Sequence, residues 1–146
     1  MEPMPRCEFD ADKVLVRFTS TIKADVAAIQ PVVNGVMHII QEMKCGAGKE
    51  FQIELALREA LANAIVHGCG NDPSKNVEVC VACDESRGLL IVVRDPGPGF
   101  DPASIPSPIT GENVFSEHGR GIFLISQLMD EVHFERGGTE IHMRKF

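Results

Sequence analysis

The sequence predicts an α+β fold, a two-layer sandwich in which three helices cover one face of a mostly antiparallel sheet. One observation is that apolar residues recur every three or four positions in three segments, as in amphipathic helices. Another is that apolar residues alternate with polar ones, or run continuously, in five shorter segments that suit strands. The order of these segments, β-α-α-β-β, a long loop and then α-β-β, is that of such a sandwich.

The first half of the chain is predicted to form one strand and two helices. Residues 1–12 show no periodicity and are expected to be a short tail, after which alternation predicts a strand over 14–18. Apolar spacing of three and four continues over about 25–44, which predicts a long helix that Pro31 either kinks or restarts. A second helix, over 51–68, is rich in Ala, Leu and Glu and ends at a glycine.

The second half of the chain is predicted to supply the rest of the sheet and a long loop. Residues 77–82 alternate, and residues 89–93 are continuously apolar, as in a central strand. Residues 96–118 are rich in Pro and Gly, and loops of this length inside a domain are typically functional lids. No repeat is visible, so residues 1–146 are expected to form one domain. The remaining elements are expected to be a helix over 121–128 and strands over 132–135 and 139–144.

Composition excludes several classes of function. The net charge of −7 and the lack of any Lys/Arg cluster argue against direct contact with nucleic acid. No apolar run approaches the length of a membrane span, and residues 1–6 lack the apolar core of a signal peptide. We therefore expect a cytoplasmic protein with no contact to a membrane.

The cysteines are expected to be reduced. Their number is odd, five, and no export signal precedes them, which fits a reducing compartment better than a disulfide framework. Cys80 and Cys83 have the spacing of a redox or zinc element, but they lie three apart in a predicted strand and so face opposite sides of the sheet. Packing is the expected role of both.

Glu59 and Asn63 are the first candidates for a functional pair. They lie four residues apart in the second predicted helix, so both side chains are on one face. Their neighbours on that face are apolar, and a carboxylate or an amide in such a setting is costly unless it has a partner. That partner is either protein or ligand.

Three further motifs follow Glu59-x-x-x-Asn63 along the chain. They are Asp95-Pro96-Gly97-Pro98-Gly99 at a strand end, Gly119-Arg120-Gly121 at a helix start and Gly138-Thr139 before the last strand. Each has an ordinary structural explanation, since the first suits a turn and glycines often mark a helix entry. All four motifs in this order are much more specific than any one of them.

In this order the motifs resemble the ATPase domain shared by DNA gyrase, Hsp90, histidine kinases and MutL, the GHKL superfamily. In size and detail the chain is most similar to the bacterial anti-sigma factor serine kinases of the stage II sporulation and stress-response type. The family's N box is matched by residues 59–68, Glu-Ala-Leu-Ala-Asn-Ala-Ile-Val-His-Gly. Its last glycine box is matched by 119–125 and its exit strand by 129–132, and the resemblance covers about 14–143.

The resemblance implies a Bergerat-type ATPase fold that binds ATP with Mg²⁺. It implies that Asn63 coordinates the Mg²⁺ ion and that Glu59 is the general base for the attacking hydroxyl. Both types suit the roles, because an amide oxygen is a hard neutral ligand and a carboxylate can deprotonate a nucleophile. His67, at the helix end near the Asn63 face, is a further candidate for the nucleotide site, although packing or capping there is the commoner role.

The other implied roles concern the adenine and the phosphates. Asp95 matches the aspartate that accepts a hydrogen bond from the adenine amino group, and Thr139 matches the threonine at the far wall of the adenine pocket. The amides around Gly119–Gly121 are expected to hold phosphate at a helix start, with Arg120 adding positive charge. Residues 96–118 carry no Lys or Arg, so Arg120 is the basic residue expected near the phosphates. The remaining candidates for nucleotide contact are Gly97, Gly99, Phe100 and Ile122.

Three functions are compatible with this resemblance. An anti-sigma kinase would sequester a sigma factor and phosphorylate a serine of an anti-anti-sigma (STAS-type) partner. A non-catalytic partner-switching module would bind nucleotide without phosphate transfer, and Glu59 favours catalysis over this. A histidine-kinase fragment would need a dimerisation hairpin, and the single helix before the core, with His38, is too little. The apolar stripe of that helix fits either a homodimer or packing on the sheet.

Overall fold

The chain folds around one five-stranded sheet, seen in a computed structural model that describes residues 14–84, 88–99 and 117–146. The strand order is β1-β2-β3-β5-β4, and every pairing is antiparallel. The last strand of the chain therefore lies between β3 and β4. The strands are β1 (Val14–Lys23), β2 (Asn76–Asp84), β3 (Gly88–Arg94), β4 (Glu131–Glu135) and β5 (Glu140–Lys145).

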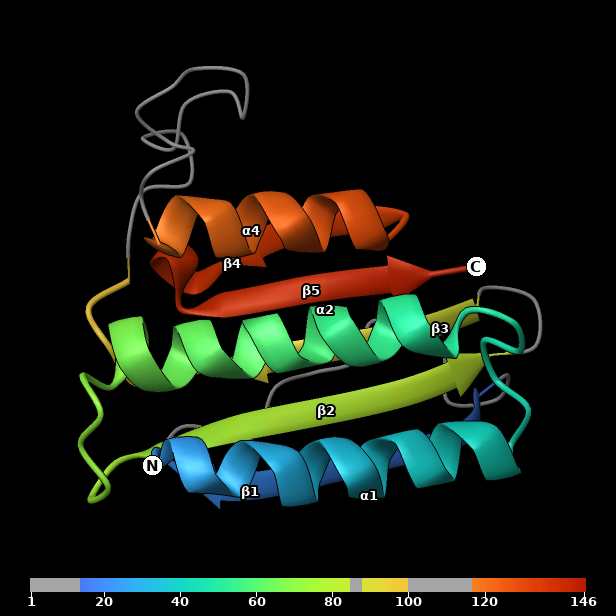
Figure 1. Ribbon diagram of the computed structural model, residues 1–146, viewed down its shortest axis with the longest axis horizontal. Coiled ribbons are helices and arrows are strands. Elements are labelled where there is room, and N and C mark those ends of the chain that lie inside the picture. Colours follow the sequence, from blue (N-terminus) through green and yellow to red (C-terminus); the bar gives the residue numbers. More distant parts are fainter. Residues whose placement is uncertain (1–13, 85–87, 100–116) are drawn as a thin grey trace.

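Three helices lie side by side across one face of the sheet (Figure 1). They are α1 (Ile29–Glu42), α2 (Glu50–Asn63) and α4 (Glu117–Leu128). Short helical turns accompany them, η2 (Val26–Ala28) before α1, η3 (Ala64–Gly68) after α2 and η5 (Arg136–Gly138) between the last two strands. The predicted α+β sandwich, with three helices on one face of the sheet, is confirmed.

Several boundaries differ from the predicted ones. β1 continues to Lys23, because Thr19–Lys23 keep pairing with β2 beyond the residues whose alternation was apparent. α4 begins at Glu117, so Gly119 and Gly121 lie within its first turns. Pro31 restarts the helical segment: η2 precedes α1, and Pro31 occupies the first turn of α1, where a backbone N–H has no helical acceptor.

The core lies between the helices and the sheet. In α2 the predicted stripe of Ile53, Leu57 and Leu61 is fully buried, in one cluster with residues of β2 and β3. The middle of the α1 stripe is buried in the same cluster, including Val33, Val36 and Ile40, so packing within the chain accounts for it. The homodimer remains a prediction.

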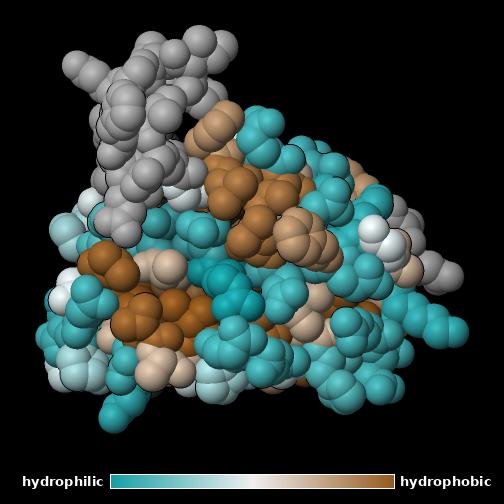
Figure 2. Space-filling view, viewed as in Figure 1, coloured by the Kyte–Doolittle hydropathy of each residue, from teal (hydrophilic) through white to brown (hydrophobic). Residues whose placement is uncertain are grey.

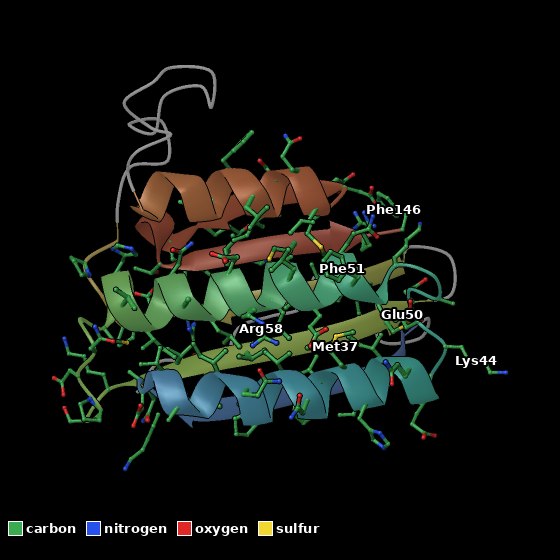
Figure 3. All side chains as sticks on the ribbon, in the orientation of Figure 1. Met37, Lys44, Glu50, Phe51, Arg58 and Phe146 are labelled. Carbon is green, nitrogen blue, oxygen red and sulfur yellow. A yellow bond between two sulfur atoms is a disulfide. The ribbon has the colours of Figure 1, made fainter. Side chains whose placement is uncertain are left out.

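Side chains between the helices tie the layer together. Met37 of α1 is buried, and the Arg58 guanidinium of α2 donates a hydrogen bond to the side-chain oxygen of Gln30 in α1 (Figure 3).

On the outer surface of the helix layer, Figure 2 shows apolar surface over α2 and α4, to which the exposed Phe51 and Phe123 contribute. None of the described helices has the length and apolar character that crossing a bilayer requires.

A disulfide bond corrects the prediction that the cysteines are reduced. Cys45, in the turn between α1 and α2, is bonded to Cys83 near the end of β2, with a Cα–Cα distance of 6.3 Å. The turn carries no pattern that would place it beside β2, which is why the pairing could not be predicted. The expected opposite facing is confirmed, since Cys83 lies in the core beneath the helices and Cys80 in a cluster on the other face.

Candidate functional site

A cavity opens beside the C-terminal end of α2. Helix residues form one side of it, and residues from β3, β5 and β4 form its floor and far wall. Predicted site residues from separate motifs meet here. Those that line the cavity are Asn63, His67, Asp95, Gly99, Ile122 and Thr139.

Glu59 and Asn63 face the start of α4. A side-chain carbon at Gly121 would lie 3.0 and 3.1 Å from the two terminal atoms of Asn63 and 3.3 Å from a carboxylate oxygen of Glu59. The α4 backbone therefore passes close to both polar groups, and a side chain at residue 121 would require Asn63 and Glu59 to shift by a few tenths of an ångström. The pair that the sequence places on one helix face is thus joined to the last glycine motif in space.

A π-type turn follows Asn63. In η3 the amide of Cys69 donates to the carbonyl of Ala64, five residues earlier, at 2.9 Å. Such wide turns within helices are rare and are often found at functional sites. Here the turn carries Gly68 against the carboxylate of Asp95, so closely that a side-chain carbon at Gly68 would overlap it. The same turn places His67 at the cavity.

Asp95 lies half-buried where β3 ends. Its amide donates to the carbonyl of Thr139 at 3.0 Å, which fixes the strand end against η5 and β5. Its carboxylate accepts a hydrogen bond from the amide of Gly97 at 2.8 Å. Burial raises the pKa of the Asp95 carboxyl, and the Gly97 amide opposes that rise. Among the described residues, no hydrogen bond is donated to the second carboxylate oxygen. Asp95 also lines the cavity.

The glycines after Asp95 allow two close backbone contacts. Gly97 lies against the carbonyl of Gly68, where a side chain would overlap it. Gly99 has a positive φ of 75° and lies against the carbonyl of Gly137, so both its conformation and its surroundings require a glycine. Of the two, Gly99 lines the cavity, and Gly97 shapes the turn behind it.

Three apolar residues of the cavity were not predicted from the sequence. Val93, Ile141 and Phe134 lie on neighbouring strands in register, Val93 opposite Ile141 and Ile141 opposite Phe134. All three line the cavity, together with Ile122 of α4. Their alternation in the strands was a visible signal, but only the strand order brings them into one row. The cavity thus combines an apolar floor with polar groups at its ends, which suits a flat heteroaromatic ring with polar edges.

Several of the predicted contacts involve residues or side chains outside the described part of the chain. Phe100 and most of the predicted lid, 100–116, lie outside the described residues. Gly119 and Arg120 belong to the first turn of α4, but their side chains are not among those that the structure describes. Their predicted contact with phosphate therefore stays a prediction.

A family model decides the relationship of this chain. The model of the histidine kinase-like ATPase domain matches residues 22–145, which include every residue of the cavity. The chain belongs to this family. A histidine kinase-like ATPase domain implies that the chain binds a nucleotide.

Relatives of this histidine kinase-like ATPase domain bear the names that the motifs suggested. An anti-sigma F factor of Geobacillus stearothermophilus is 32% identical over 99 residues, covering 64% of this chain and 67% of the relative. The serine-protein kinase RsbW of Bacillus licheniformis is 34% identical over 101 residues, covering 64% and 62%. RsbW of Staphylococcus epidermidis is 33% identical over 101 residues, covering 64% and 63%. The predicted resemblance to anti-sigma factor serine kinases is confirmed.

Proposed function

We propose that this protein is an ATP-dependent serine kinase that sequesters a sigma factor and phosphorylates a serine of an anti-anti-sigma partner. The observation that carries the proposal is the approach of Gly121 to Asn63 and Glu59. This approach brings a side-chain amide, a carboxylate and the start of a helix together, and Asn63 also lines the cavity. The names of the relatives support the kinase and anti-sigma parts of the proposal.

The adenine of ATP is proposed to occupy the apolar part of the cavity. Val93, Phe134 and Ile141 would contact its ring, and the ionised Asp95 would accept a hydrogen bond from its amino group. The triphosphate would then extend toward α4, where the amides of the first helical turn favour negative charge. The predicted lid lacks Lys and Arg, so these amides and Arg120 carry more of the phosphate binding.

Asn63 is proposed to hold Mg²⁺ through its side-chain oxygen. The fit rests on the donor chemistry, since Mg²⁺ typically takes one or two protein oxygens and completes its coordination with phosphates and water. When bound, the ion neutralises charge that develops on the phosphates during transfer.

Glu59 is proposed to act as the general base. A serine hydroxyl of the partner would attack the γ-phosphorus of ATP, and its proton would pass to the Glu59 carboxylate. The bond from the γ-phosphorus to the bridging oxygen breaks, which leaves ADP and a phosphoserine. Glu59 and Asn63 both face Gly121, and this closeness supports the two proposed roles.

The proposed function is tested with the full chain, γ-labelled ATP and a small candidate partner domain that carries a serine. A neighbouring gene that encodes such a domain would be the first candidate. Label is expected on that serine, and its substitution by alanine should remove the label. A protein that binds ATP and the partner but transfers no phosphate would be a non-catalytic partner-switching module instead.

Acidification is expected to weaken nucleotide binding at a pH higher than that at which an ordinary aspartate is protonated. Asp95 accepts the hydrogen bond of adenine only when it is ionised, and burial raises the pKa of its carboxyl. Affinity should therefore fall as the pH drops through this raised pKa. The contribution of Asp95 to the stability of the fold changes in the opposite direction. It increases as the pH falls, because protonation removes the cost of burying the charge.

Calorimetric titration with Mg·ATP, from neutral pH to about pH 4, measures this dependence. Asp95→Asn is the matched variant, since its amide does not titrate and should show weak binding without that transition. The same pH dependence in the wild-type chain and in Asp95→Asn would remove Asp95 from the adenine site.

A further inference from the structure

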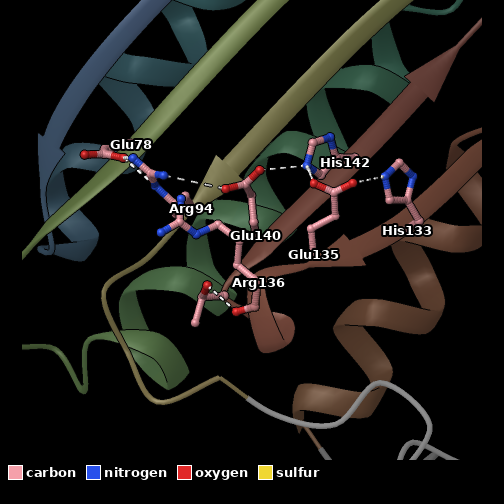
Figure 4. Close-up of polar contacts among 8 residues, drawn as sticks. Glu78, Arg94, His133, Glu135, Arg136, Glu140 and His142 are labelled. Carbon is pink, nitrogen blue, oxygen red and sulfur yellow. Dashed lines mark hydrogen bonds and ion pairs between the residues drawn. The ribbon is translucent and has the colours of Figure 1, made fainter. Parts of the chain in front are cut away.

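A second cluster of polar side chains lies on the face of the sheet opposite to the helices. It consists of His133 and Glu135 on β4 and of Glu140 and His142 on β5 (Figure 4). The register pairs His133 with His142 and Glu135 with Glu140. Because residues two apart share a face of a strand, all four side chains project from the same side.

The ligand-type atoms of this cluster converge. The imidazole Nε2 atoms of His133 and His142 each lie 3.4 Å from an oxygen of Glu135, His133 from one oxygen and His142 from the other. The two rings are stacked, with centroids 4.6 Å apart. One ligand atom from each of the three residues lies within 4.8 Å of the others. Two imidazoles and a carboxylate thus surround one small volume.

We propose that His133, Glu135 and His142 bind a divalent transition-metal ion, with zinc as the ion whose usual ligands these are. A His-x-Glu pair on one strand and a histidine opposite it on the neighbouring strand supply three ligands. Because the two rings are stacked at an interplanar angle of 13°, they would have to tilt toward a common point for both Nε2 atoms to reach the distance of about 2.0 to 2.1 Å that zinc requires. Three protein ligands leave a fourth position for water.

An ion-pair network without metal explains the cluster less well. The Nε2 atom of His142 carries at most one proton, yet it faces oxygens of Glu140 at 2.8 Å and of Glu135 at 3.4 Å. Glu135 and Glu140 are also directly opposite in the register, where like charges destabilise a sheet. The Arg94 guanidinium, which is also paired with Glu78, lies 3.7 Å from Glu140 and so offsets the charge of that member. A cation between the two histidines and Glu135 would balance the negative charge of Glu135.

The cluster combines a rigid interior with an open side. The side chain of His142 is 2% exposed, whereas those of His133 and Glu135 are 46% and 49% exposed on the edge strand. An ion can therefore enter from solvent and meet a ligand that is already held in place. A carboxylate oxygen of Glu140 lies 2.8 Å from the Nε2 atom of His142, and this carboxylate would turn toward Arg94 when the ion binds.

The proposal is tested by titrating the full chain, first dialysed against a chelator, with ZnCl₂ in a calorimeter. One zinc ion per chain is expected, and Co²⁺ in its place should give the visible absorption of a tetrahedral site. His133→Ala is the main variant, because this side chain is half-exposed and its removal leaves the core intact. It should weaken zinc binding at least about tenfold, since a ligand is lost.

The matched control is His38→Ala, which removes another exposed histidine beside a glutamate, on α1. Its zinc affinity should equal that of the wild-type chain. Two results would overturn the proposal: no stoichiometric zinc binding by the wild-type chain, which would leave a metal-free ion-pair network, or equal affinity in the wild-type chain and His133→Ala. The test uses no nucleotide, so it stands whether or not the protein proves to be a kinase.

Discussion

Asn63→Ala is expected to lower the affinity for Mg·ATP about 100-fold. The substitution removes the side-chain oxygen proposed to hold Mg²⁺ and leaves the cavity walls in place. Loss of one interaction with a charged group costs about 3 kcal/mol, which lowers affinity about 100-fold. Isothermal titration calorimetry with ATP, in the presence and in the absence of Mg²⁺, measures the effect, and the larger loss is expected with Mg²⁺.

Asn34→Ala is the matched control for this variant. Asn34 also lies on a helix, α1, but it is exposed, and its side-chain oxygen accepts a hydrogen bond from the side chain of Gln30. Its affinity for Mg·ATP should be that of the wild-type chain. If Asn63→Ala were to bind Mg·ATP as tightly as this control, Asn63 would have no part in the site.

Glu59→Gln is expected to retain ATP binding and to lose phosphate transfer. The amide keeps the size of the carboxylate and one of its acceptor oxygens beside Gly121, but it cannot accept the proton of the attacking serine. Removing a general base typically lowers the rate about 100-fold to 10,000-fold. Transfer from γ-labelled ATP to the partner serine, measured at saturating ATP, separates this loss from a loss of binding.

Glu50→Gln tests whether any loss of charge on α2 has the same effect. Glu50 lies in the first turn of the same helix, at the other end from Asn63. Both the affinity and the transfer rate should be unchanged in this variant. Equal transfer rates in Glu59→Gln and the wild-type chain would reject Glu59 as the base, while leaving the nucleotide site proposed around Asn63 intact.

The helical part of the candidate site could be predicted from the sequence because its geometry is local. The spacing of Glu59 and Asn63 places both on one face of any α-helix, and the stripe of Ile53, Leu57 and Leu61 says which face is buried. Beyond Asn63 the rule of 100° per residue no longer holds, since η3 is a π-type turn. The contact of Gly68 with Asp95 could not be derived from a helical wheel.

The parts that escaped prediction depend on pairings between distant segments. Val93, Phe134 and Ile141 form one row only because β5 lies between β3 and β4. Strand alternation shows which side chains share a face of each strand, but the register decides which side chains meet. The same reasoning applies to His133 and His142, whose ligand atoms approach one another only across the β4–β5 pairing.

The bond between Cys45 and Cys83 also has a consequence for the integrity of the chain. It closes a covalent ring, with a sequence separation of 38, that contains all of α2 and η3 and the loop 70–75. Most of that loop is exposed, which makes it a natural target for a protease. A cut there would open the ring without dividing the molecule. Asn63 and Asp95 would remain on one covalent molecule until a thiol reductant released the two fragments.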